Sequence, residues 1–386
     1  MRAAALIQVL AACLFLTACG TLERPAAALR AAPLDVLHRT EVRSRPSDAQ
    51  SMQAYAEEMS HLLDGDRPIR LLALSGGGAN GAFGAGVLTG WSRRGDRPVF
   101  DVVTGVSTGA LSAPYAFLGQ DWDDALERAY TEGRTSKLVA LDNMALLFQP
   151  SLFSAAPLRR LVDENVTPEM LAAIAAEHRK GRRLLVATTD LDREETVIWD
   201  MGALAEQGDE DSRTLFKEIL VASAAIPGVF PPVLIAARNN GDAVFEMHVD
   251  GGVNTPFLAI PEGLLDWTRP GGRNGGEIYV LVNGVLSQRD QPTLGTFGAV
   301  LGRSYDSMTK TALRRDLMLT QSFARRNGLA LKVTSIPPEW PSSSLDFAPQ
   351  AMKALFERAE RYGEEGPFLR DPVKASPAAL SVGVER

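Results

Sequence analysis

The chain is poor in the residues that build disulfide frameworks and metal sites. Of its 386 residues only two are cysteines, Cys13 and Cys19, and both fall near the N-terminus. Its four histidines are scattered, and no His or Cys pair has a metal-ligand spacing. The sequence therefore excludes a disulfide-stapled fold and predicts neither a metal site nor a cofactor.

Blocks of positive charge are also missing. The formal net charge is −7 and no stretch is rich in Lys and Arg, which argues against nucleic acid as a partner. A hydrophobic content of 45% and a charged content of 23% are ordinary for a globular protein. A chain of this length can hold one large α/β domain, or one domain with appendages, and it shows no internal repeat.

One short apolar run, over residues 3–16, is too brief to span a bilayer comfortably. It leads into Leu-Thr-Ala-Cys-Gly and predicts a secretory signal peptide over residues 1–18. The small residues before Cys19 resemble a bacterial lipobox, so we expect Cys19 to be lipidated and to anchor the protein to a membrane. The alternative is an ordinary signal peptide with an incidental cysteine. The residue after the cysteine is Gly20 rather than an aspartate, which resembles lipoproteins that are sent to the outer membrane. We therefore expect the protein to be anchored in the bacterial cell envelope, at the outer membrane and facing the periplasm.

Residues 19–65 are predicted to form a tether and a short helix. The tether is rich in Ala, Pro and Arg and has no amphipathic period as far as about residue 48. Its arginines, including Arg43 and Arg45, are expected to be solvated or to lie near anionic lipid head groups. Helical character begins at residue 49.

The rest of the chain is divided into two parts. We expect a catalytic domain over residues 66–290, in which the apolar stretch 138–153 forms a loop that lines or covers the site. A C-terminal helical extension is predicted over residues 291–386, packed on the catalytic domain.

A compact pattern of strand, glycine loop, helix and strand occupies residues 69–110. The apolar run 69–74 ends at Gly76-Gly77-Gly78, which is typical of a buried parallel strand that feeds a tight turn. A second apolar run, 99–104, leads into Gly105-Val106-Ser107-Thr108-Gly109. A G-x-S-x-G sequence between a strand and a helix-forming segment indicates a nucleophile elbow. Gly105 and Gly109 relieve the crowding of its strained turn, and Ser107 is presented at the carboxyl end of the sheet.

The two glycine motifs serve one chemistry together. A serine that attacks an ester carbonyl needs backbone N–H groups directed at the oxyanion that forms. Gly76, Gly77 and Gly78 leave no side chains to block such groups, and the start of the next helix adds partial positive charge. We therefore expect Ser107 to be the nucleophile and these glycines to form the oxyanion hole.

An attacking serine also needs a base within hydrogen-bond reach. Three of the histidines lie in the tether or in predicted surface helices, which leaves His248, and Asp250 two residues later on the same predicted strand. Residues i and i+2 share a face of a strand but lie about 6 to 7 Å apart along it, so the two are distinct candidates. A third interpretation is that Asp250 only forms a turn with Gly251. We favour Asp250, which must be partly buried, with a raised pKa, to act as the base.

These motifs resemble those of the patatin-like phospholipase family. The family pattern is a glycine-rich loop, a G-x-S-x-G serine and an Asp-Gly pair, and a block similar to the family's Ala-Ser-x-x-x-Pro-x-x-Phe-x-Pro begins at Ala222. The resemblance covers about residues 69–285. It implies that Ser107 is the nucleophile, that Asp250 activates it, and that the backbone of Gly77 and Gly78 forms the oxyanion hole.

One position departs from the family pattern. The family loop commonly carries a basic residue two places after the triple glycine, where this chain has Asn80. A basic side chain there would attract an anionic head group, so its absence weakens the expectation of charged phospholipid substrates. The serine chemistry is unaffected.

The sequence thus predicts a three-layer α/β/α sandwich with a largely parallel central sheet and a patatin-like fold. The predicted function is that of a serine acyl hydrolase of the lipase or phospholipase A type, acting on membrane lipids or other lipid esters. One alternative is a non-catalytic lipid-binding lipoprotein that keeps the fold. Another is a dinucleotide-binding enzyme, because Gly76, Gly78 and Gly81 also fit G-x-G-x-x-G, but the acidic residue expected at the end of the second strand is missing.

Overall fold

The computed structural model describes residues 42–46, 48–63, 68–132, 154–239, 242–268, 275–288, 292–366 and 368. The predicted signal peptide, Cys19 and the loop predicted over residues 138–153 lie outside these residues. Within them, no helix has both the length and the apolar character needed to cross a membrane.

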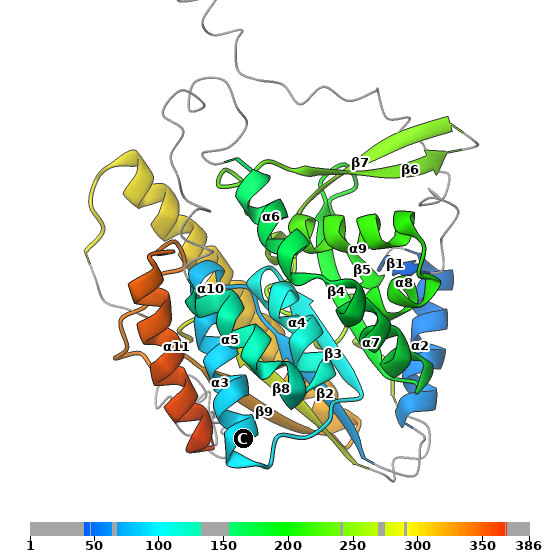
Figure 1. Ribbon diagram of the computed structural model, residues 1–386, viewed down its shortest axis with the longest axis horizontal. Coiled ribbons are helices and arrows are strands. Elements are labelled where there is room, and N and C mark those ends of the chain that lie inside the picture. Colours follow the sequence, from blue (N-terminus) through cyan, green and yellow to red (C-terminus); the bar gives the residue numbers. More distant parts are fainter. Residues whose placement is uncertain are drawn as a thin grey trace, which may run out of the picture.

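A mixed sheet forms the centre of the described structure (Figure 1). Its middle is a run of five neighbouring parallel strands in the order β4-β3-β2-β8-β9. These are β4 (Arg183–Asp190), β3 (Val102–Val106), β2 (Ile69–Leu74), β8 (Gly276–Val282) and β9 (Ala330–Ser335). Apolar runs such as Ile-Arg-Leu-Leu-Ala-Leu in β2 suit strands that are covered on both faces.

Antiparallel strands extend the sheet on the β4 side. Strand β5 (Glu195–Asp200) pairs with β4, and the two-residue β1 (Arg43–Ser44) pairs with β5. The hairpin of β6 (Val233–Asn239) and β7 (Asp242–Asp250) joins β4 through β7. It lies along the top of the view in Figure 1.

Helices cover both faces of the sheet, so the predicted three-layer α/β/α architecture is confirmed. Alternate residues of β2 face opposite ways: Leu72 and Leu74 belong to one hydrophobic core, and Leu71 and Ala73 to the other. The first core includes residues of α3 (Gly81–Arg94), α4 (Thr108–Leu118), α5 (Asp123–Thr131), α6 (Ala156–Asn165), α7 (Pro168–Arg179), α8 (Met201–Gln207), α9 (Glu210–Ser223) and α11 (Pro349–Glu364). The second includes residues of α2 (Ala49–Leu63) and α10 (Phe297–Arg326).

The structure corrects one expectation about the N-terminal segment. Arg43 and Arg45, predicted to be solvated in the tether, are 8% and 9% exposed and form ion pairs with acidic residues of the sheet. Arg43 also belongs to strand β1. The segment from Val42 onward is therefore part of the fold.

Helices α3 and α11 pack with their backbones in close contact. A Cβ atom on Gly90 of α3 would lie 1.9 Å from the carbonyl oxygen of Glu360 in α11, and one on Gly86 would lie 2.3 Å from that of Phe356. The residues after 290 therefore bind tightly to the glycine-rich helix that follows the glycine loop, and they also supply β9 to the sheet.

Replacing Gly90 with alanine tests this contact. The added methyl group must push α11 away, so Gly90→Ala should lower the free energy of unfolding by roughly 1–3 kcal/mol, measured by urea titration. Gly302→Ala is the control, because Gly302 lies in α10 with no atom within 4 Å of its would-be Cβ. The control should be neutral or stabilising by up to about 1 kcal/mol. Equal stability of the two variants would contradict the packing described.

Candidate active site

Ser107 sits at a sharp turn between strand β3 and helix α4. Its backbone has φ 57° and ψ −128°, a conformation that a residue with a side chain adopts only under constraint. A Cβ on Gly105 would lie 2.6 Å from Ala110 Cα, and one on Gly109 would lie 2.4 Å from the Leu74 carbonyl oxygen. The glycines of G-x-S-x-G are thus required because α4 begins directly against the sheet, as expected for a nucleophile elbow.

Asp250 reaches the same place from the opposite direction. Strand β3 pairs with β4 as far as Val106 opposite Ala187, and β7 takes over the same edge of β4, antiparallel, with Asp250 opposite Thr188. Strands β3 and β7 therefore meet end to end on β4. The residue that follows β3 is Ser107, and the residue that ends β7 is Asp250.

Residues at the end of helix α9 form hydrogen bonds with the backbones of both Ser107 and Asp250. The Ser107 backbone N–H donates to Ser223 Oγ at 3.0 Å, and the Ser223 hydroxyl donates to the Ala187 carbonyl at 2.7 Å. The Asp250 N–H donates to the Ala225 carbonyl at 3.0 Å. The Ala-Ser motif was singled out in the sequence without a role. Its role in the structure is to fix the ends of β3 and β7 relative to each other.

The glycine loop lies beside Ser107, but its three residues differ. A Cβ on Gly76 would lie 3.1 Å from Ser107 Cβ, so this glycine permits the close approach. Its N–H already donates to the Pro256 carbonyl at 3.0 Å, which removes Gly76 from the expected oxyanion donors. The N–H groups of Gly77 and Gly78 donate to no residue in the part of the chain that the structure describes. Gly78 has φ +56°, a backbone conformation that favours glycine.

Asn283, directly after β8, fixes the position of this loop. Its side-chain amide donates to the Ser75 carbonyl at 2.8 Å, its backbone N–H donates to Ser75 Oγ at 2.8 Å, and its Oδ1 accepts from Gly84 N–H at 3.0 Å. Its carbonyl oxygen would lie 2.1 Å from a Cβ on Gly77. Sequence reasoning did not identify Asn283, although an asparagine at the carboxyl end of a buried strand is a signal that points to this edge.

The Asp250 carboxyl group is almost fully buried, with 1% of the residue exposed. Burial raises the pKa of Asp250 from 3.8 to about 7, partly offset by the Ser107 hydroxyl and the Gly252 N–H, which favour the carboxylate. Gly252 N–H donates to Oδ1 at 2.7 Å. Oδ2 has no hydrogen bond of full geometry to any described residue. Oδ2 of Asp250 can therefore accept a further hydrogen bond, and the Ser107 hydroxyl is close enough to affect the pKa of this carboxyl group.

His248 is separated from this chemistry. It is fully buried, its Nδ1 lies 3.0 Å from Thr188 Oγ1, and its Nε2 lies 3.3 Å from Glu246 Oε2. Trp199 Nε1 donates to the same Thr188 hydroxyl at 2.8 Å. Both ring nitrogens of His248 are thus engaged inside the sheet, while Asp250 lies at the strand's end.

The ligand-type atoms of Asp190, Glu246 and His248 lie within 4.8 Å of one another, a spacing at which a metal ion could be held. Both carboxylates already bind guanidinium groups: Arg45 pairs with Asp190 at 3.0 Å and with Glu246 at 2.9 Å, and Arg43 pairs with Glu246 at 2.7 Å. Arginine side chains therefore supply the positive charge that a metal ion would otherwise bring to these carboxylates.

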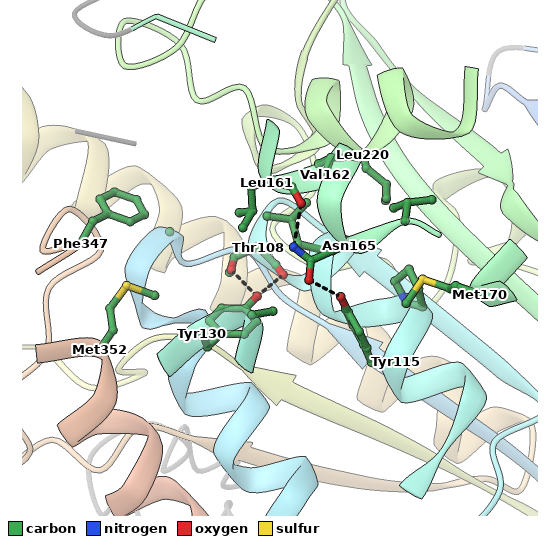
Figure 2. A pocket seen from close by; sticks show the side chains of 15 residues that line it. Thr108, Tyr115, Tyr130, Leu161, Val162, Asn165, Met170, Leu220, Phe347 and Met352 are labelled. Carbon is green, nitrogen blue, oxygen red and sulfur yellow. Dashed lines mark hydrogen bonds between the residues drawn. The ribbon is translucent and has the colours of Figure 1, made fainter. Parts of the chain in front are cut away.

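An apolar cavity of about 60 Å³ lies along helix α4 (Figure 2). It begins beside Gly78 and Thr108, next to the candidate site, and extends along α4 to Tyr115. There the Tyr115 hydroxyl donates to Asn165 Oδ1 at 3.1 Å. Its other lining residues are Leu111, Pro114, Ala129, Tyr130, Leu161, Val162, Val166, Met170, Leu220, Phe347 and Met352.

Comparison with known proteins identifies the domain. Residues 72–260 match the family of patatin-like phospholipases. They therefore form a patatin-like phospholipase domain, and the resemblance drawn from the motifs is confirmed.

Sequence and structure comparisons add little beyond the fold. No curated protein matches the chain. Among solved structures, VipD from Legionella pneumophila is similar at 14% identity and a TM-score of 0.35, over 78% of this chain and 66% of VipD. The type III effector protein ExoU is similar at 13% identity and a TM-score of 0.30, over 78% of this chain and 54% of ExoU. The chain thus spans just under two thirds of VipD and about half of ExoU.

The raised pKa of Asp250 predicts a pH-dependent effect on stability. Between pH 3.8 and about 7 the folded protein holds a proton on Asp250 that the unfolded chain has lost, so Asp250 lowers stability as the pH rises through this window. The Asp250→Asn variant lacks this penalty. Its melting temperature should exceed that of the parent at a pH above about 7 and converge on it near pH 4. A variant that is less stable at the higher pH would contradict the buried, proton-retaining Asp250.

Proposed function

We propose that this protein is a serine acyl hydrolase that cleaves carboxylic esters of lipids, with Ser107 as nucleophile and Asp250 as its base. The observation that carries the proposal is the junction of β3 and β7 on β4, which brings Ser107 and a buried Asp250 together. It lies within a patatin-like phospholipase domain.

Ester hydrolysis proceeds in two steps, acylation of Ser107 and hydrolysis of the acyl-enzyme, and Asp250 transfers a proton in both. Asp250 takes the Ser107 hydroxyl proton while Oγ bonds to the ester carbonyl carbon, and the protonated Asp250 then gives that proton to the departing alcohol. Water next attacks the carbonyl carbon of the acyl-enzyme while Asp250 accepts a proton from it, and Asp250 returns this proton to Ser107 Oγ as the bond to the fatty acid breaks. A base with a pKa of about 7 is well matched to this exchange near neutral pH.

The oxyanion donors in this proposal are the N–H groups of Gly77 and Gly78. They are the amides of the loop that remain without a partner among the described residues, whereas Gly76 is bonded to Pro256. Removing one oxyanion donor from a hydrolase typically costs about a hundredfold to a thousandfold in kcat. Gly76 contributes by its lack of a side chain beside Ser107.

The cavity along α4 supports an acyl group as the part of the substrate that lies beside the nucleophile. Gly78 and Thr108 are among its lining residues, and its walls are mostly apolar (Figure 2). An apolar cavity of this kind suits the hydrocarbon part of an ester substrate.

The place of the protein in the cell is a proposal from the sequence. A lipid on Cys19 would hold the domain beside the membrane that supplies insoluble esters, with the bacterial outer membrane, on its periplasmic side, as the expected location. The support is the short apolar run that leads into Leu-Thr-Ala-Cys-Gly.

The structure gives the dinucleotide-binding alternative no support. The Ser344 carbonyl oxygen would lie 2.2 Å from a Cβ on Gly78, and it accepts the Ala79 N–H at 2.9 Å. Another segment of the chain therefore occupies the space over Gly78, where a pyrophosphate would have to approach.

Fatty-acid release from phospholipid vesicles tests the proposed function. Ser107→Ala and Asp250→Asn should each lower the rate by about a hundredfold or more, because each removes a group that takes part in every proton transfer or bond formation. His248→Gln is the control for the base, and it should cost less than about tenfold. An inactive His248→Gln variant beside an active Asp250→Asn variant would reverse the assignment.

A soluble butyryl ester completes this test. Hydrolysis of this ester without release from phospholipid would point to neutral or short-chain substrates. No hydrolysis of either would favour the lipid-binding alternative, in which the fold is kept without its chemistry.

A further inference from the structure

A buried cluster of charges joins the N-terminal segment to the strand that carries Asp250. Arg43 pairs with Glu246 at 2.7 Å, although the two residues are 203 positions apart in the chain. Arg45 pairs with Glu246 at 2.9 Å, with Asp190 at 3.0 Å and with Glu195 at 2.6 Å. The cluster thus connects β1 to the strands β7, β4 and β5.

Burial makes these ion pairs interdependent. The side chains of Asp190 and Glu246 are 0% and 3% exposed, and those of Arg43 and Arg45 are 5% and 10% exposed. Burial alone would raise the pKa of Glu246, but His248 and the two arginines outweigh it and lower that pKa to about 2. Arg193 adds a longer contact of 3.8 Å to Asp190. Removing one partner of a buried pair leaves an uncompensated charge, which is strongly unfavourable.

The cluster lies beside the short pairing of β7 with β4, which positions Asp250. Strand β7 is paired with β4 through three residue pairs, which are Thr188 with Asp250, Thr189 with Val249 and Asp190 with His248. The carboxylates of the cluster come from both of these strands, Asp190 from β4 and Glu246 from β7. Without the arginines, the two negative charges would repel each other across the short ladder that ends at Asp250.

We propose that Arg43 and Arg45 are positioning residues for Asp250: by neutralising Glu246 and Asp190 they hold the end of β7 against β4, and so hold Asp250 beside Ser107. This inference rests on the proposed function, in which Asp250 is the base. The C-terminal end of the predicted tether is then a working part of the catalytic domain.

The experiment measures kcat and KM of the purified protein on a soluble butyryl ester, together with the melting temperature. The variants are Arg43→Met and Arg45→Met, which keep much of the side-chain length and remove the charge, and Arg43→Lys and Arg45→Lys, which keep the charge. Arg97→Met is the matched control. The Arg97 side chain is as buried as those of Arg43 and Arg45 and pairs with Asp123 at 2.8 Å, and its hydrogen bonds go to α3, α4 and α5.

The proposal predicts that the methionine variants lose kcat by about tenfold to a hundredfold, the range expected for a misplaced catalytic group, with KM changed much less. The lysine variants should recover most of this loss, and Arg97→Met should keep kcat even though its melting temperature falls. If a methionine variant fails to fold, Glu246→Gln replaces it. Glutamine keeps the shape of the side chain but removes the charge through which Arg43 and Arg45 hold β7. That variant should show the same selective loss of kcat.

Two outcomes would overturn the proposal. One is a set of folded methionine and glutamine variants that keep the parent kcat. The other is an Arg97→Met variant that loses as much kcat as they do, which would mean that any buried ion pair matters equally. Inactivity of the parent protein on both the butyryl ester and phospholipid vesicles would instead reject the proposed function, so the two failures are distinguishable.

Discussion

The meeting of β3 and β7 end to end on one edge of β4 is the constraint on which the candidate site depends. Parallel strand β3 stops at Val106, and antiparallel β7 fills the rest of that edge as far as Asp250. Neither strand extends into the other's space, because Ser107 turns the chain sharply into α4. Ser107 and Asp250 are far apart in the sequence, but this junction makes them neighbours. No loop has to close over the site to bring them together.

The surroundings of this junction hold Ser107 and Asp250 in place and bury them. Ser223 and Ala225 bond to the backbones of Ser107 and Asp250, and Asn283 holds the glycine loop through Ser75. Ser107 and Asp250 are 4% and 1% exposed. A carboxylate is a weaker base than an imidazole in water, and burial compensates for this by raising the pKa of Asp250 to about 7.

Local sequence patterns predicted most of the architecture, because those patterns are set within a few residues. The apolar run predicted over residues 69–74 has the bounds of β2, and the helical character predicted from residue 49 begins where α2 begins. The short helix α8 was missed, because Met201–Gln207 is too brief to show a clear period.

What the sequence could not reveal are partners that are distant along the chain. The burial of Arg43 depends on Glu246, and a sequence in which arginine stands among alanines and prolines carries no sign of that contact. The bond from Gly76 N–H to Pro256 is likewise invisible in a triple glycine, so the three glycines could not be distinguished before the fold was known. The roles of Ser223 and Asn283 are long-range contacts of the same kind.

Covalent labelling by an organophosphonate would show whether Ser107 is the nucleophile and Asp250 its base, and it requires no choice of lipid. We expect a label on the peptide that contains Ser107, with a rate that rises as the pH passes through about 7 and that collapses in the Asp250→Asn variant. A label on another serine, or a Ser107 labelling rate that is indifferent to Asp250→Asn, would contradict this assignment.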